Sequence, residues 1–171
     1  MDSLLPDPEI LVGIAALGLT VTGFSGLISV LGRRVSGYWT EAERFQLGEL
    51  IVVSLAVTFT SFIPILVGML QTPEKALTTS SFLIALCHLI VLSRGALRNF
   101  REGASGVKIP NVTAAFMIVG GVALIAGAFL AAFDIIGGAA FFIVFNLLWQ
   151  LLVAAINFVI LLMGTGSPDD S

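Results

Sequence analysis

The sequence predicts an all-α, polytopic integral membrane protein with five transmembrane helices. Of its 171 residues, 57% are hydrophobic and 11% are charged, and the mean hydropathy is +1.06. A soluble domain carries about 25% charged residues, and one of this size has too little interior to hide so much apolar surface. We therefore expect a single membrane domain over residues 1–171, located in the cell membrane as in a multi-pass bacterial inner-membrane protein.

The first span is predicted over residues 10–32, an uncharged run of about 23 residues that is long enough to cross a hydrocarbon core of roughly 30 Å. Asp7 is suited to cap a helix whose first residue is Pro8. Arg33 and Arg34 follow the span. Because no basic residue precedes it, a cleaved signal peptide is not expected, and we expect the first helix to be retained.

The second span is predicted over residues 47–70 and the third over residues 80–98. Pro64 predicts a kink in the second helix, because proline removes a backbone hydrogen bond and clashes with the preceding turn. Thr72 precedes a proline and is suited to cap the third helix, which we expect to continue to about Arg101.

The last apolar stretch must hold two spans, predicted over residues 112–133 and 139–163. As one helix it would measure roughly 78 Å, far beyond one bilayer. Asp134, Gly137 and Gly138 supply the break, because glycines and aspartate suit a tight turn.

The basic residues predict the orientation. Seven of the eight lysines and arginines lie in or beside the loops 33–46 and 99–111, and only Lys75 lies on the opposite side of a five-span chain. By the positive-inside rule these two loops are cytoplasmic, so the N-terminus is expected outside and the C-terminus inside.

Small polar residues form a stripe along each of the first two helices, at spacings that place them on one helix face. The stripes consist of Thr22, Ser25 and Ser29, and of Ser54, Thr58 and Ser61. Two interpretations stay open. Small residues let helix backbones approach closely in lipid, whereas hydroxyl groups also line aqueous pores and solute paths.

The fifth span carries a stripe of carboxamides, Asn146, Gln150 and Asn157, at i, i+4 and i+11. An unpaired amide in hydrocarbon costs several kcal/mol, so these side chains should face protein or water. His88 lies near the middle of the third span. It is either a hydrogen-bonded packing residue or a proton-linked group, because ionisable residues inside membranes are candidates for function.

The sequence was also compared with the patterns of catalytic, metal-binding, nucleotide-binding and lipid-binding sites. Ser25 stands in Gly-Phe-Ser-Gly, but the fifth position is Leu27 and the surroundings are helical, so a hydrolase nucleophile elbow is not expected. No metal-ligand spacing or nucleotide-binding loop is present, so we expect no metal, no cofactor and no nucleic acid. Contact with anionic lipid is a candidate role for three arginines that recur on one helix face: Arg94, Arg98 and Arg101.

These observations predict a non-enzymatic membrane protein that acts through helix packing as a subunit or accessory component. Its expected partners are the lipid bilayer and either another copy of itself or another membrane protein. One alternative is a homo-oligomeric ion or small-solute channel lined by the Ser/Thr and Asn/Gln stripes. Another is a proton-linked membrane subunit that uses His88.

Overall fold

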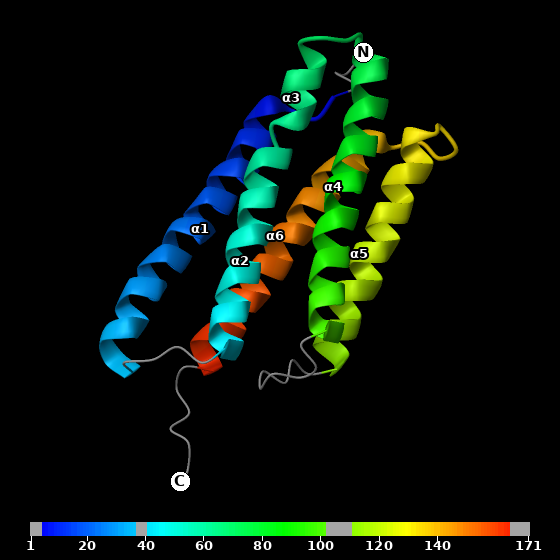
Figure 1. The fold of residues 1–171 in the computed structure, drawn as a ribbon. Coiled ribbons are helices and arrows are strands. Elements are labelled where there is room, and N and C mark those ends of the chain that lie inside the picture. The colour runs from blue at the N-terminus through cyan, green and yellow to red at the C-terminus, as the bar shows by residue number, and fades with distance from the viewer. Residues whose placement is uncertain (1–4, 37–40, 102–110, 165–171) are drawn as a thin grey trace.

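The chain folds into antiparallel helices arranged as a bundle (Figure 1). The structure is a computed structural model and describes residues 5–36, 41–101 and 111–164. In these ranges the only regular elements are the helices α1 (Pro8–Ser36), α2 (Glu41–Thr60), α3 (Ile63–Gly68), α4 (Pro73–Arg101), α5 (Asn111–Ala132) and α6 (Ala139–Gly164). Five stretches of the described chain are long and apolar enough to cross a membrane, with α2 and α3 together forming one of them.

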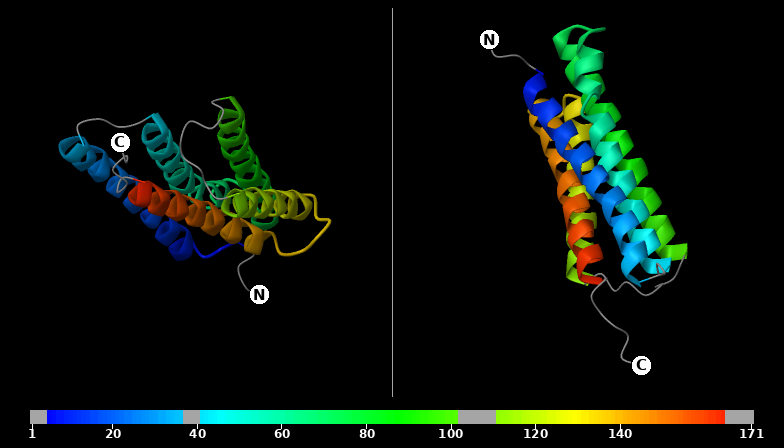
Figure 2. Two further views of the ribbon diagram at one scale, coloured as in Figure 1. Left: turned by 90° about the horizontal axis from the view of Figure 1, so that it is seen from below. Right: turned by 90° about the vertical axis from the view of Figure 1, so that its left-hand side faces the viewer.

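Helix α6 lies at the centre of this arrangement. It contacts α1, α2, α4 and α5. Figures 1 and 2 show α1 at one edge of the bundle and α5 at the other. Four other helices therefore pack against α6. Its carboxamide side chains lie where they can contact several helices at once.

The helix ends follow local rules that can be read in the sequence. The Asp7 side chain accepts a hydrogen bond from Glu9 N at 2.9 Å, so it caps α1 as predicted, with Pro8 in the first position. Between α5 and α6, Asp134 adopts a left-handed conformation with φ of 57°, and Ile135 N donates to Leu130 O at 2.9 Å. These contacts form a Schellman-type helix end, with aspartate in the place that glycine usually takes.

The second span differs from the predicted kinked helix, because the helix is broken. Helix α2 ends at Thr60 and α3 begins at Ile63. In the intervening turn, Phe62 N donates to Phe59 O at 3.2 Å. This bond to the third preceding residue is typical of a 3₁₀ turn, which is tighter than an α-helical one, and the helix resumes after it. Pro64 occupies an early position of α3, where its missing N–H has no intrahelical partner to lose.

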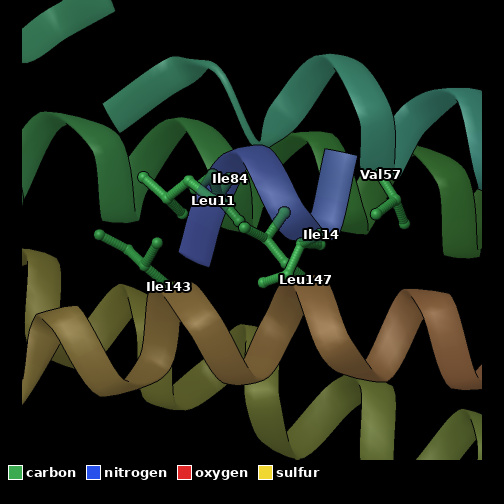
Figure 3. Close-up of a cluster of buried hydrophobic side chains, with 6 residues drawn as sticks. All are labelled: Leu11, Ile14, Val57, Ile84, Ile143 and Leu147. Atoms are coloured by element: carbon green, nitrogen blue, oxygen red, sulfur yellow. The ribbon is translucent and has the colours of Figure 1, made fainter. Parts of the chain in front are cut away.

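Two hydrophobic clusters lie in the interior along the length of the bundle. The first cluster, shown in Figure 3, contains Leu11, Ile14, Val57, Ile84, Ile143 and Leu147. The second cluster contains Leu50, Val53, Ala154 and Leu161. The first cluster draws on α1, α2, α4 and α6, and the second on α2 and α6, so packing of these side chains joins the helices to one another.

Candidate functional site

Three buried polar residues lie along their helices between members of the two hydrophobic clusters. Ser54 lies between Val53 and Val57 on α2, and its side chain is fully buried. His88 lies between Ile84 and Val91 on α4, and Gln150 lies between Leu147 and Ala154 on α6. Asn146 is fully buried and lies one turn before Gln150, beside Ile143 and Leu147 of the first cluster. We call these four residues, Ser54, His88, Asn146 and Gln150, the polar layer.

Asn146 is the hub of the polar layer. Its Nδ2 donates to Phe142 O on its own helix at 2.9 Å and to Leu124 O on α5 at 3.1 Å. Its Oδ1 lies 2.7 Å from Nδ1 of His88 on α4. One carboxamide therefore joins α4, α5 and α6.

The bonds of Asn146 also fix the tautomer of His88. Backbone carbonyl oxygens only accept hydrogen bonds, so the atom of Asn146 that faces two of them is the amide nitrogen. The oxygen then faces His88, and Nδ1 must carry the proton that it donates. In the neutral imidazole this leaves Nε2 as an acceptor.

The hydroxyl stripes of α1 and α2 face one another. Oγ1 of Thr22 and Oγ of Ser54 are 2.8 Å apart, and either atom can be the donor. One turn further along, the Thr58 hydroxyl donates to Ser54 O at 2.9 Å and lies 3.4 Å from Ala15 O of α1. These residues therefore line a contact between two helices of the same chain.

Gly18 allows α1 and α2 to come this close. A Cβ atom at Gly18 would lie 2.7 Å from Oγ1 of Thr58 and 2.9 Å from the backbone oxygen of Ser54. The second of these atoms belongs to the helix backbone and cannot move aside cheaply. Close approach of this kind is what small residues provide between helices in lipid.

The remaining hydroxyls of the stripes have different surroundings. Ser25 is fully buried and donates to Val21 O at 2.7 Å, whereas Ser29 is half-buried. Ser61 is fully buried in the turn after α2 and donates to Val57 O at 2.8 Å. The hydroxyl groups of Ser25 and Ser61 thus each donate a hydrogen bond to the backbone carbonyl four residues earlier in the chain.

The other two carboxamides of α6 differ from Asn146. Gln150 is 2% exposed, yet neither Oε1 nor Nε2 has a hydrogen-bond partner among the described residues. Asn157 is half-buried, and its backbone oxygen accepts a long bond of 3.5 Å from Nε2 of Gln46 on α2. The predicted stripe therefore contains a satisfied hub, an unsatisfied buried amide and a partly exposed amide.

Two glycines of α5 lie beneath aromatic rings of α6. A Cβ at Gly120 would overlap the ring of Trp149, and one at Gly127 would overlap the ring of Phe142. The indole of Trp149 also packs against Phe116, with ring centroids 4.8 Å apart. Here glycine makes room for a large side chain of the neighbouring helix.

Sequence reasoning missed four buried polar residues, Gln46, Thr60, Ser80 and Ser81. Ser81 donates to Ala128 O at 3.0 Å and so joins α4 to α5. Helical spacing supplies a signal for three of them, since Ser81 lies at i−7 and Ser80 at i−8 from His88, and Gln46 lies at i−8 from Ser54. Thr60 has no comparable signal. Oγ of Ser80 has no hydrogen-bond partner among the described residues.

The three arginines lie on α4, toward its C-terminal end. The side chain of Arg94 is exposed, while the side chains of Arg98 and Arg101 lie outside the described part of the structure. Among the described residues no group of three or more His, Cys, Asp or Glu side chains is placed to hold a metal ion.

The sequence matches no protein-family model, no curated protein and no solved structure.

Proposed function

We propose that this chain is a non-enzymatic, multi-pass integral membrane protein that acts as a subunit or accessory component through contacts inside the membrane. The cell membrane, in a bacterium the inner membrane, is its proposed location. Five stretches of suitable length and composition support this proposal. So do the large apolar side chains on the outer faces of the helices, such as Leu19, Phe59 and Val119, each of which is more than half exposed.

The positions of the charged residues support an orientation with the N-terminus outside and the C-terminus inside. Arg44 lies near the start of α2 and Arg94 near the end of α4, at the same end of the bundle in Figure 1. Lys75 lies at the start of α4, at the other end. A basic end facing the cytoplasm agrees with the positive-inside rule.

The observation that carries the proposal is the pairing of polar side chains within one chain. Thr22 bonds to Ser54, and Asn146 bonds to His88 and to α5. Side chains that line an aqueous pore would direct these groups toward water. Their use between helices instead favours helix packing, and it favours a hydrogen-bonded His88 over a proton-linked one.

Contact with a further helix is supported by the outer face of α1. A Cβ at Gly23 or Gly26, which share one helix face, would meet no atom within 4 Å. Glycine inside a helix costs about 1 kcal/mol relative to alanine, and no contact within the described chain accounts for these two. Close approach by a helix of a second copy or of another membrane protein would account for them.

The proposal is tested by measuring the mass of the purified protein in nanodiscs together with ion flux through liposomes that contain it. We expect no flux above that of empty liposomes, in the wild type and in Gln150→Leu alike. A closed oligomer whose flux changes in Gln150→Leu, with normal assembly, would contradict the proposal and establish the channel alternative. Leu148→Ile, on the exposed face of α6, is the control variant.

A further inference from the structure

We infer that Arg94 of α4 binds the phosphate of an anionic phospholipid at the edge of the bilayer. The inference rests on the proposed membrane location and adds a lipid site to it. Residues 76–93 of α4 include no charged side chain. At 1.5 Å per residue this stretch measures about 27 Å, close to the roughly 30 Å of a hydrocarbon core. Lys75 and Arg94, which flank the stretch, therefore lie at its two edges.

Arg94 lies on the outer face of α4. Its side chain is exposed. Ile90, one turn before it, is 57% exposed, and Leu97, one turn after it, is 62% exposed. Residues three and four positions apart share one face of a helix. Arg94 therefore continues a row of apolar side chains that faces the lipid.

The described part of the chain offers Arg94 no partner for its charge. Arg94 makes no hydrogen bond or ion pair with another described residue. The sequence has no aspartate or glutamate over residues 87–101. Glu49 of α2 approaches α4 at Gly95, where its Oε2 lies 3.5 Å from the point that a Cβ would occupy. Glu49 is half-buried, however, and forms no ion pair with the exposed Arg94.

The partner of this guanidinium must therefore come from outside the chain. A charge left in hydrocarbon is costly, and the long stem of arginine lets its head reach the interface. Lipid phosphates lie at that depth, and the planar guanidinium binds a phosphate through two parallel N–H···O bonds. Arg98 and Arg101 follow at i+4 and i+7 on the same helix. Their positive charge favours a lipid with a net negative charge.

The test measures lipid binding to the delipidated protein by native mass spectrometry. The probes are phosphatidylglycerol and phosphatidylcholine, since only the first has a net negative charge. We expect the wild type to bind phosphatidylglycerol more tightly. Arg94→Gln should weaken binding of phosphatidylglycerol about fivefold, which corresponds to the effect of one basic residue near a membrane surface. Its effect on phosphatidylcholine should be smaller.

Two matched variants remove a positive charge elsewhere. Lys75→Gln acts at the other end of α4, beside Glu74. Arg44→Gln acts at the same end of the bundle as Arg94, where Glu41 and Glu43 lie within three positions in the sequence. Both variants should keep the wild-type preference for phosphatidylglycerol. Equal affinity of the wild type for the two lipids, or an equal loss in all three variants, would overturn the inference.

Arg94→Gln should fold like the wild type, because the side chain is exposed, and circular dichroism checks this. If it does not fold, Arg94→Lys takes its place, since an ammonium group cannot form the two parallel bonds, and unchanged affinity would then overturn the inference. A chain that does not insert into bilayers would overturn the proposed function. An inserted chain without the lipid preference would overturn the lipid site alone.

Discussion

His88 of α4 and Asn146 of α6 form a side-chain hydrogen bond of 2.7 Å, although 58 positions separate them in the chain. The same carboxamide donates to Leu124 O and Phe142 O. Because these three bonds meet at one carboxamide, loss of Asn146 would remove all three at once and leave the Nδ1 donor of the buried His88 without its partner. The hub is therefore the place where a single substitution should affect three helices.

Asn146→Leu should lower the free energy of unfolding by about 1–3 kcal/mol, since it leaves a buried imidazole donor without a partner and removes the hydrogen bond from α6 to a carbonyl of α5. Reversible unfolding in mixed detergent micelles would measure this loss. Asn157→Leu is the matched control on the same helix, because the side chain there is half-buried. Equal effects of the two substitutions would show that the hub contributes nothing of its own.

Gln150→Leu should have the opposite effect and raise the free energy of unfolding. The substitution removes a buried amide that has no partner among the described residues, so we expect stability to rise by about 1–3 kcal/mol. Gln46→Leu, at a buried amide that does donate to another helix, should not stabilise the protein. A loss of stability in Gln150→Leu would mean that Gln150 is hydrogen-bonded in the membrane, for example to water in a channel that it lines.

Gly18→Ala should destabilise the contact between α1 and α2 by about 1–3 kcal/mol, because the added methyl group meets the backbone of Ser54. Gly13→Ala on the same helix meets nothing within 4 Å and should be neutral or stabilising by up to about 1 kcal/mol. Thermal denaturation of both variants in one detergent would compare them. If Gly18→Ala is tolerated as well as Gly13→Ala, α1 and α2 do not approach each other as closely at Gly18 as the structure shows.

The orientation can be tested with single cysteines in a Cys87→Ser background. Thr72 and Arg44 are both exposed, near opposite ends of the bundle. A cysteine in place of Thr72 should react with a membrane-impermeant thiol reagent added to intact cells, and one in place of Arg44 should react only after permeabilisation. The reverse pattern would invert the proposed topology.

Local features of the fold could be predicted from the sequence. Hydropathy and stop signals place five apolar helices, Asp7 caps the first, and the turn at Asp134 separates the last two. These features depend on residues that are neighbours in the chain. The break after Thr60 was not predicted, because sequence alone shows that a proline disturbs a helix but not whether the chain bends or starts a new helix.

The site was only partly accessible to sequence reasoning. Helical periodicity indicates which residues share a face, and it found Asn146, Thr22 and Ser54. It does not show which faces meet, so the pairing of His88 with Asn146 and the position of the Trp149 indole over Gly120 required the structure. Periodicity also grouped Asn157 with Asn146, although only the latter is fully buried.

The central claim is that the hydroxyl stripes of α1 and α2 face one another within one chain. In the Cys87→Ser background, the double variant T22C/S54C places two thiols where the hydroxyl oxygens are 2.8 Å apart. Mild oxidation in membranes should form an internal disulfide that migrates as a monomer on a non-reducing gel and is protected from impermeant thiol reagents. Disulfide-linked dimers, or thiols that stay free and react readily with those reagents, would contradict the claim and place the stripes at a subunit interface or a water-filled path.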